Sequence, residues 1–86
     1  MDRERVLMLL KSKLCNICTV VDIPLGTYEY NGYKLQYDSR LVILNGEKFV
    51  CSISYTQIDD VYVVLRYNEQ QICNELYEMI CYEISK

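Results

Sequence analysis

The sequence predicts an α+β fold: an N-terminal helix, a four- or five-stranded antiparallel β-meander and a C-terminal helix, with both helices packed on one sheet face. Three observations support this prediction. Apolar residues recur at helical spacing near both ends, the middle of the chain alternates apolar and polar residues, and two Asn-Gly pairs interrupt that alternation. A chain of 86 residues can build one modest core, so we expect residues 1–86 to form a single domain.

The first element is an amphipathic helix over residues 2–14. Val6, Leu10 and Leu14 recur every four positions, which places them on one helix face. Asp2 is a suitable N-cap, because its carboxylate can accept hydrogen bonds from the free amides of the first turn.

The pattern is weakest over residues 15–26. The β-branched run at Thr19-Val20-Val21 favours a short strand. Pro24 disfavours helix at Ile23, and Gly26 suits a turn. Whether residues 15–23 form a strand or a loop stays open.

The first Asn-Gly pair, Asn31-Gly32, predicts a β-hairpin, because Asn and Gly tolerate the positive φ angles of a type I′ turn. This turn sets Tyr30 opposite Tyr33 and Glu29 opposite Lys34, so an aromatic pair and an opposite-charge pair align. One face of the hairpin then holds Tyr28, Tyr30, Tyr33, Leu35 and Tyr37. We expect the helices to cover that face, which assigns these tyrosines to the core.

The second pair, Asn45-Gly46, predicts another hairpin with two alternative registers. A two-residue loop places Val42 opposite Phe49, and a three-residue loop with a bulge at Gly46 places Leu41 opposite Phe49. We favour the second register because it gathers the apolar residues on one face. That face consists of Leu41, Ile43, Phe49, Cys51, Ile53 and Tyr55, and Val42, Lys48, Val50, Ser52 and Ser54 lie on the other.

Alternation continues over residues 61–67 and predicts a further strand, with Tyr62, Val64 and Arg66 on the face turned away from the helices. The last helix begins at Asn68, which forms a capping-box pattern with Gln71. Its buried side is predicted to hold Ile72, Cys73, Leu76, Met79, Ile80 and Ile84. Glu75, Glu78 and Tyr82 fall on the opposite side.

The charge argues against direct binding to nucleic acid. The net charge is −3, and a nucleic-acid binder normally shows a basic patch that replaces the counterions of phosphates. Residues 1–14 hold four basic and two acidic residues, whereas residues 68–86 hold one basic and four acidic residues. The two terminal helices could therefore lie side by side in one monomer or meet across a homodimer.

We expect a cytoplasmic protein without a membrane segment. The apolar run at residues 6–10 is too short for a secretory signal, and no stretch reaches the length that spans a bilayer. An odd number of cysteines, five, fits a reducing compartment better than a disulfide framework.

Cys15-x-x-Cys18 is the one recognisable motif, and it gives the alternative hypothesis of a cysteine-based zinc or thiol-redox protein. A zinc site needs two further ligands, and without histidine these would have to be Cys51, Cys73 or Cys81. A redox dithiol is expected just before a helix, where the helix N-terminus lowers the thiol pKa, but this motif follows a helix. We therefore predict no metal site and no cofactor.

No other residue pattern predicts an enzyme. A Ser-His or Cys-His pair is excluded because the chain has no histidine, and its three glycines fit turns better than a phosphate loop. Asp59 and Asp60, like Glu75 and Glu78, have the pattern of solvated charge rather than of converging carboxylates.

The sequence thus favours a non-catalytic protein-binding module. Small acidic single-domain chains of this kind suit stoichiometric inhibitors or adaptors, such as the anti-CRISPR-like proteins that phages direct against host defence complexes. Such a protein would block a nucleic-acid-binding partner sterically or by charge mimicry. The predicted contact residues are Val50, Tyr62, Val64 and Arg66 on the sheet, and Glu75, Glu78 and Tyr82 on the last helix.

Overall fold

The computed structural model describes residues 1–23 and 26–86, with the backbone alone at residues 27, 28, 30 and 35–37. The described residues form three helices and five strands. In order these are α1 (Arg3–Leu14), β1 (Thr19–Asp22), β2 (Gly26–Tyr30), β3 (Tyr33–Tyr37), β4 (Ser39–Asn45), β5 (Lys48–Ser54), α2 (Tyr55–Leu65) and α3 (Glu69–Ile84). The α+β class is therefore confirmed, with an extra helix where a strand was predicted.

The strands form two separate sheets in place of one meander. β1, β4 and β5 form a three-stranded antiparallel sheet with β4 in the centre, and β2 and β3 form a two-stranded hairpin. The short strand favoured at Thr19-Val20-Val21 forms as β1 (Thr19–Asp22). The turn expected at Gly26 is wrong, because Gly26 pairs with Tyr37 as the first residue of β2.

One pairing register nevertheless runs through both sheets. Thr19 pairs with Leu44 in the larger sheet and Tyr30 pairs with Tyr33 beside the hairpin turn, and in both sheets the numbers of paired residues add up to 63. Between the sheets, the Ile23 amide donates to the Arg40 carbonyl at 2.8 Å. β1–β2 and β3–β4 are thus the two sides of one long antiparallel ribbon that ends at Asn31-Gly32.

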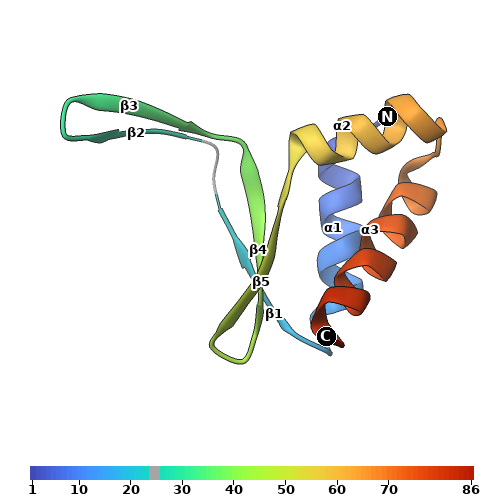
Figure 1. Cartoon of the computed structure of the whole chain (residues 1–86). Coiled ribbons are helices and arrows are strands. Elements are labelled where there is room, and N and C mark those ends of the chain that lie inside the picture. The colour runs from blue at the N-terminus through green and yellow to red at the C-terminus, as the bar shows by residue number, and fades with distance from the viewer. Residues whose placement is uncertain (24–25) are drawn as a thin grey trace.

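The helices cover one face of the three-stranded sheet (Figure 1). Leu41, Ile43 and Ile53 point to this side and are almost fully buried. α1 and α3 pack on each other, and α2 crosses one end of the pair. The helices supply the rest of the core: Val6, Leu7, Leu10, Leu14, Ile58, Ile72, Cys73, Leu76 and Ile80.

Two predicted helix starts are confirmed by their caps. The Asp2 carboxylate accepts from the Arg5 amide at 3.2 Å. The Asn68 side chain accepts from the Gln71 amide at 2.9 Å, and the Gln71 side chain accepts from the Asn68 amide at 3.0 Å. No helix in the described part of the chain is both long and apolar enough to cross a membrane.

The predicted strand over residues 61–67 is wrong, because Tyr55–Leu65 forms helix α2. A capping box between Ser54 and Gln57 starts this helix, and Ile58 anchors it with no exposed surface. The β-branched residues in its second half suit a strand locally. The burial of Ile58 in the core favours the helix, because tertiary burial outweighs the intrinsic preference of these residues for a strand.

The register of the second hairpin differs from both predicted alternatives. Asn45 pairs with Lys48 and Leu44 with Phe49, so Gly46-Glu47 form the loop, with Gly46 at φ 65°. A register shift between Ile43 and Leu44 leaves Val50 as the extra residue of a bulge. This bulge turns the Phe49 side chain away from the predicted core face, and it is 59% exposed.

Helix α2 ends at a residue in the left-handed conformation, Arg66 at φ 56°, whose amide donates to the Tyr62 carbonyl at 2.8 Å. Glycine adopts this conformation without the steric cost that a side chain brings. We expect Arg66→Gly to raise the free energy of unfolding by about 0.5–1 kcal/mol, as measured by urea denaturation. Arg66→Ala keeps the strain and serves as the control. Equal stability of the two variants would contradict this explanation.

Candidate functional site

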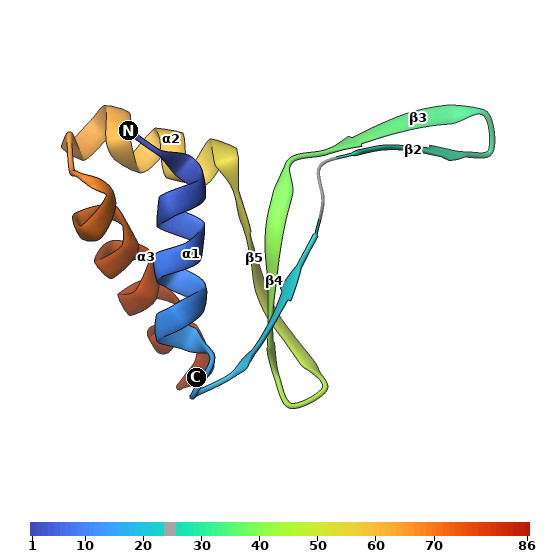
Figure 2. The same cartoon turned by 180° about the vertical axis from the view of Figure 1, so that it is seen from behind.

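The β2–β3 hairpin projects from the body of the protein and is named the arm (residues 26–37). It leaves on the side of the sheet opposite the helices, and both views show no helix against it (Figures 1 and 2). Its turn is the predicted one, since Asn31 and Gly32 have φ angles of 50° and 80°. The predicted pairing of Glu29 with Lys34 is also confirmed.

The expectation that the helices cover the tyrosine face of this hairpin is wrong. Tyr33 is 74% exposed at the tip of the arm. Tyr28 and Tyr30 were predicted to lie in the core. Their side chains lie outside the described part of the structure, but no helix packs on their strand, β2 (Figure 2). No helix reaches the hairpin, because the helical layer ends where the larger sheet ends and the ribbon continues beyond it.

The four predicted contact residues on the sheet do not share a surface. Val50 lies in the bulge of β5, where it is half-buried against the core. Tyr62 and Val64 belong to helix α2, with Tyr62 packed against the core and Val64 76% exposed. Arg66 is the exposed C-cap of that helix. The grouping failed because it depended on the strand predicted over residues 61–67.

The uncovered face of the three-stranded sheet, named the outer sheet face, is made of other residues. One row of paired positions crosses it at Val21, Val42 and Ser52, and the next row holds Thr19, Leu44 and Phe49. Val21 is 42% exposed, and Phe49 is the more exposed of the two at 59%. Strand alternation alone could have assigned Val21, Val42 and Leu44 to one face. It could not assign Phe49, because the bulge at Val50 shifts the alternation in β5.

The predicted contact residues on the last helix do share one face. Glu75, Glu78 and Tyr82 are all exposed along α3. Within the part of the chain that the structure describes, no ion pair uses Glu75 or Glu78. Tyr82 lies under the Lys86 ammonium, which is 5.0 Å from its ring centroid. These two carboxylates therefore remain available to a basic partner.

The basic α1 and acidic α3 lie beside each other in the monomer, which answers one question that the charge pattern left open. Their polar contact involves no carboxylate: Lys13 donates to the Asn74 side chain at 3.0 Å and stands 4.4 Å from the Tyr77 ring centroid. Lys11 instead pairs with Asp22 on β1.

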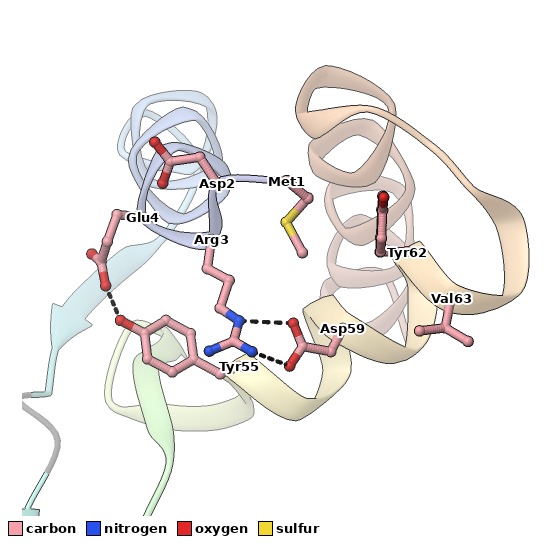
Figure 3. Close-up of a pocket in the computed structure, with 8 residues that line it drawn as sticks. All are labelled: Met1, Asp2, Arg3, Glu4, Tyr55, Asp59, Tyr62 and Val63. Atoms are coloured by element: carbon pink, nitrogen blue, oxygen red, sulfur yellow. Dashed lines mark hydrogen bonds and ion pairs between the residues drawn. The ribbon is translucent and has the colours of Figure 1, made fainter.

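A polar cluster around Tyr55 joins the first turns of α1 and α2 (Figure 3), and Arg40 connects it to the base of the arm. The Tyr55 hydroxyl donates to Glu4 and accepts from Arg40, and Arg40 also donates to the Ile23 carbonyl at 3.1 Å. Arg3 forms a bidentate pair with Asp59 at 2.8 and 2.7 Å. Both guanidinium groups lie near the Tyr55 ring, at 5.2 and 5.1 Å from its centroid.

A shallow recess of about 800 Å³ lies over this cluster and is lined by Met1, Asp2, Arg3, Glu4, Tyr55, Asp59, Tyr62 and Val63. Several of its polar side chains already have partners: Figure 3 shows Arg3 paired with Asp59 and Glu4 bonded to Tyr55, and Asp2 caps α1. The arrangement therefore links the first turn of α1 to the first turns of α2. Tyr55, predicted as a strand residue, is the first residue of α2.

The CxxC cysteines lack the setting of a reactive dithiol. Cys15 is exposed at the C-cap of α1, and Cys18 is half-buried. Burial raises the pKa of the Cys18 thiol, with the Cys81 and Cys15 thiols adding to the effect, whereas an activated thiol has a lowered pKa. Among the described residues, no three cysteine, aspartate or glutamate side chains are placed to share a metal ion.

Comparison with known proteins finds no matching family model, no similar curated protein and no similar solved structure. The geometry of the chain itself must therefore support any functional assignment.

We expect Tyr55→Phe to lower the free energy of unfolding by about 1–2 kcal/mol, because the hydroxyl group makes hydrogen bonds to two charged side chains in a half-buried position. Tyr33→Phe is the matched control, since Tyr33 is 74% exposed and should change stability by less than about 0.5 kcal/mol. Urea denaturation measures both. Equal effects of the two substitutions would show that the Tyr55 cluster adds nothing to stability.

Burial also raises the pKa of the Cys51 thiol above its ordinary value of 9.0, with smaller contributions from Glu83 and Cys18. A raised pKa in the folded state means that folding favours the neutral thiol. Its stabilising effect is complete below pH 9 and is lost as the pH rises through the raised value. We expect the urea midpoint to fall as the pH rises above 9.0, and to fall less in Cys51→Ala. Equal losses in both proteins would contradict the assignment to Cys51.

Proposed function

We propose that this chain is a non-catalytic protein-binding module that docks its β2–β3 arm on a partner. One observation carries the proposal: the arm extends from the body with no helix packed against it (Figures 1 and 2). A two-stranded hairpin is marginally stable in water, because it buries too little apolar surface to offset the loss of chain entropy. Contact with a partner would supply the missing burial.

The residues of the arm suit protein contact. Positions 28, 30, 33 and 37 are all tyrosine, and the register places Tyr30 directly opposite Tyr33. Tyrosine offers a large contact area and a hydroxyl group while losing few rotamers on binding. Glu29 and Lys34 pair across the strands and give the arm no net charge, which disfavours docking on phosphates.

The acidic face of α3 supports a partner with a basic surface. Glu75 and Glu78 are exposed and make no ion pair among the described residues, so a partner could neutralise them without breaking a contact of this chain. A nucleic-acid-binding groove has the complementary charge. In that case the carboxylates would occupy the place of phosphates, and the chain would act as a stoichiometric inhibitor or adaptor by occlusion.

The alternative, a cysteine-based zinc or thiol-redox protein, has less support. Burial raises the pKa of the Cys18 thiol, which disfavours the thiolate that a redox dithiol needs as its nucleophile. Elemental analysis of the purified protein tests this alternative directly, and stoichiometric zinc would favour it over the binding module.

We expect Tyr33→Ala and the double variant Glu75→Lys/Glu78→Lys each to weaken binding to a purified partner by about tenfold or more. The partner is first recovered with the immobilised wild-type chain, and its affinity for each variant is then measured by calorimetry. The affinity of the wild-type chain should also fall as the salt concentration rises, because salt screens the α3 carboxylates.

Met8→Ala is the control, since Met8 is 65% exposed on α1 and belongs to neither surface. If the partner binds the Tyr33→Ala variant as tightly as the wild type, the arm is not part of the interface. If it binds the Glu75→Lys/Glu78→Lys variant as tightly as the wild type, α3 is not part of it. If both variants bind like the wild type, the proposal is wrong.

A further inference from the structure

The outer sheet face is an apolar surface without charged residues. Its two rows contain Val21, Val42, Leu44 and Phe49, with Thr19 and Ser52 as the polar members. Val21 and Phe49 are 42% and 59% exposed. An exposed apolar face on a small soluble domain usually marks an interaction surface.

The acidic face of α3 lies on the other side of the sheet (Figures 1 and 2). The helices pack on the opposite face of the sheet (Figures 1 and 2). Glu75 and Glu78 are exposed on α3. Arg40 and Asp22 come from the same strands as the outer face, but their side chains bond to α1 through Glu4 and Lys11. The sheet thus separates a charged layer from an uncharged face.

We propose that the outer sheet face binds a second copy of this chain, which gives a symmetric dimer of stacked sheets. In a two-fold interface the same patch meets itself, so a patch with charge of one sign would be repelled by its copy. The outer sheet face avoids this repulsion. Stacking through it also keeps the helical layers of the two copies on the outside of the dimer, which matters for a chain of net charge −3.

The geometry suits packing of sheet against sheet. Two such faces interlock about 10 Å apart, and the apolar rows of one copy would then cover those of the other. The arm leaves the body on the same side as the outer face, so in the dimer each arm would lie beside the second copy (Figures 1 and 2). A dimer would thus carry two arms, which would raise its avidity for a partner with two sites.

Sedimentation equilibrium in reducing buffer tests the dimer, because the reducing agent excludes disulfide-linked species. At about 100 μM chain, where a dimer of micromolar Kd is almost fully assembled, we expect twice the chain mass of 10.2 kDa. Phe49→Glu and Val21→Glu place a carboxylate opposite its own copy and should each weaken the dimer by about tenfold or more. Both positions are exposed in the monomer, so these variants should fold.

Val64→Glu is the matched control, because Val64 is 76% exposed on α2, away from the outer sheet face. It should remain a dimer, and circular dichroism should show the same helix content in all variants. A wild-type monomer at about 100 μM, or a folded Phe49→Glu variant that dimerises like the wild type, would overturn the proposal. Tyr33→Ala separates the two proposals, since it should lower partner affinity while leaving the mass at twice that of the chain.

Discussion

The antiparallel pairing of β1–β2 with β3–β4 is the constraint on which the rest of the structure depends. Strand side chains alternate between the two faces, so a shift by one residue would exchange the buried and the exposed sets. In the observed register Leu41 and Ile43 point to the helices and are buried. The same register places Val42 and Leu44 on the outer sheet face. One pairing therefore defines the core and the surface that we assign to the second copy.

The ribbon is longer than the helical layer, and the Tyr55 cluster lies where the layer ends. There Arg40 links the edge of the ribbon, through the Ile23 carbonyl, to Glu4 of α1 and to the Tyr55 hydroxyl. Three elements distant in sequence are thus joined by charged hydrogen bonds, and the bonds of Arg40 to Tyr55 and Ile23 are half-buried, where such bonds are stronger than in open water. This contact fixes the base of the arm and leaves its tip free of contacts with the helices.

The fold divides the surface into three parts with different chemistry. The helical layer is charged, the outer sheet face is uncharged and apolar, and the arm is rich in tyrosine with no net charge. Each part suits a different contact, because carboxylates favour a basic surface, an uncharged apolar face tolerates its own copy, and tyrosines bind protein surfaces with little entropy loss. A dimer that presents two arms and two acidic helices is consistent with all three.

The sequence by itself determined the features that depend on residues a few positions apart. These are the caps at Asp2 and Asn68, the Asn31-Gly32 turn with its register, and the exposed face of α3. Only the tertiary structure decided that residues 61–65 are helical and that the arm stands clear of the helices. The Ser54–Gln57 capping box was a local sign of α2, but the β-branched residues after it favoured a strand. The choice depended on the burial of Ile58 in a core built by distant segments, and periodicity within one segment carries no information about which segments will meet.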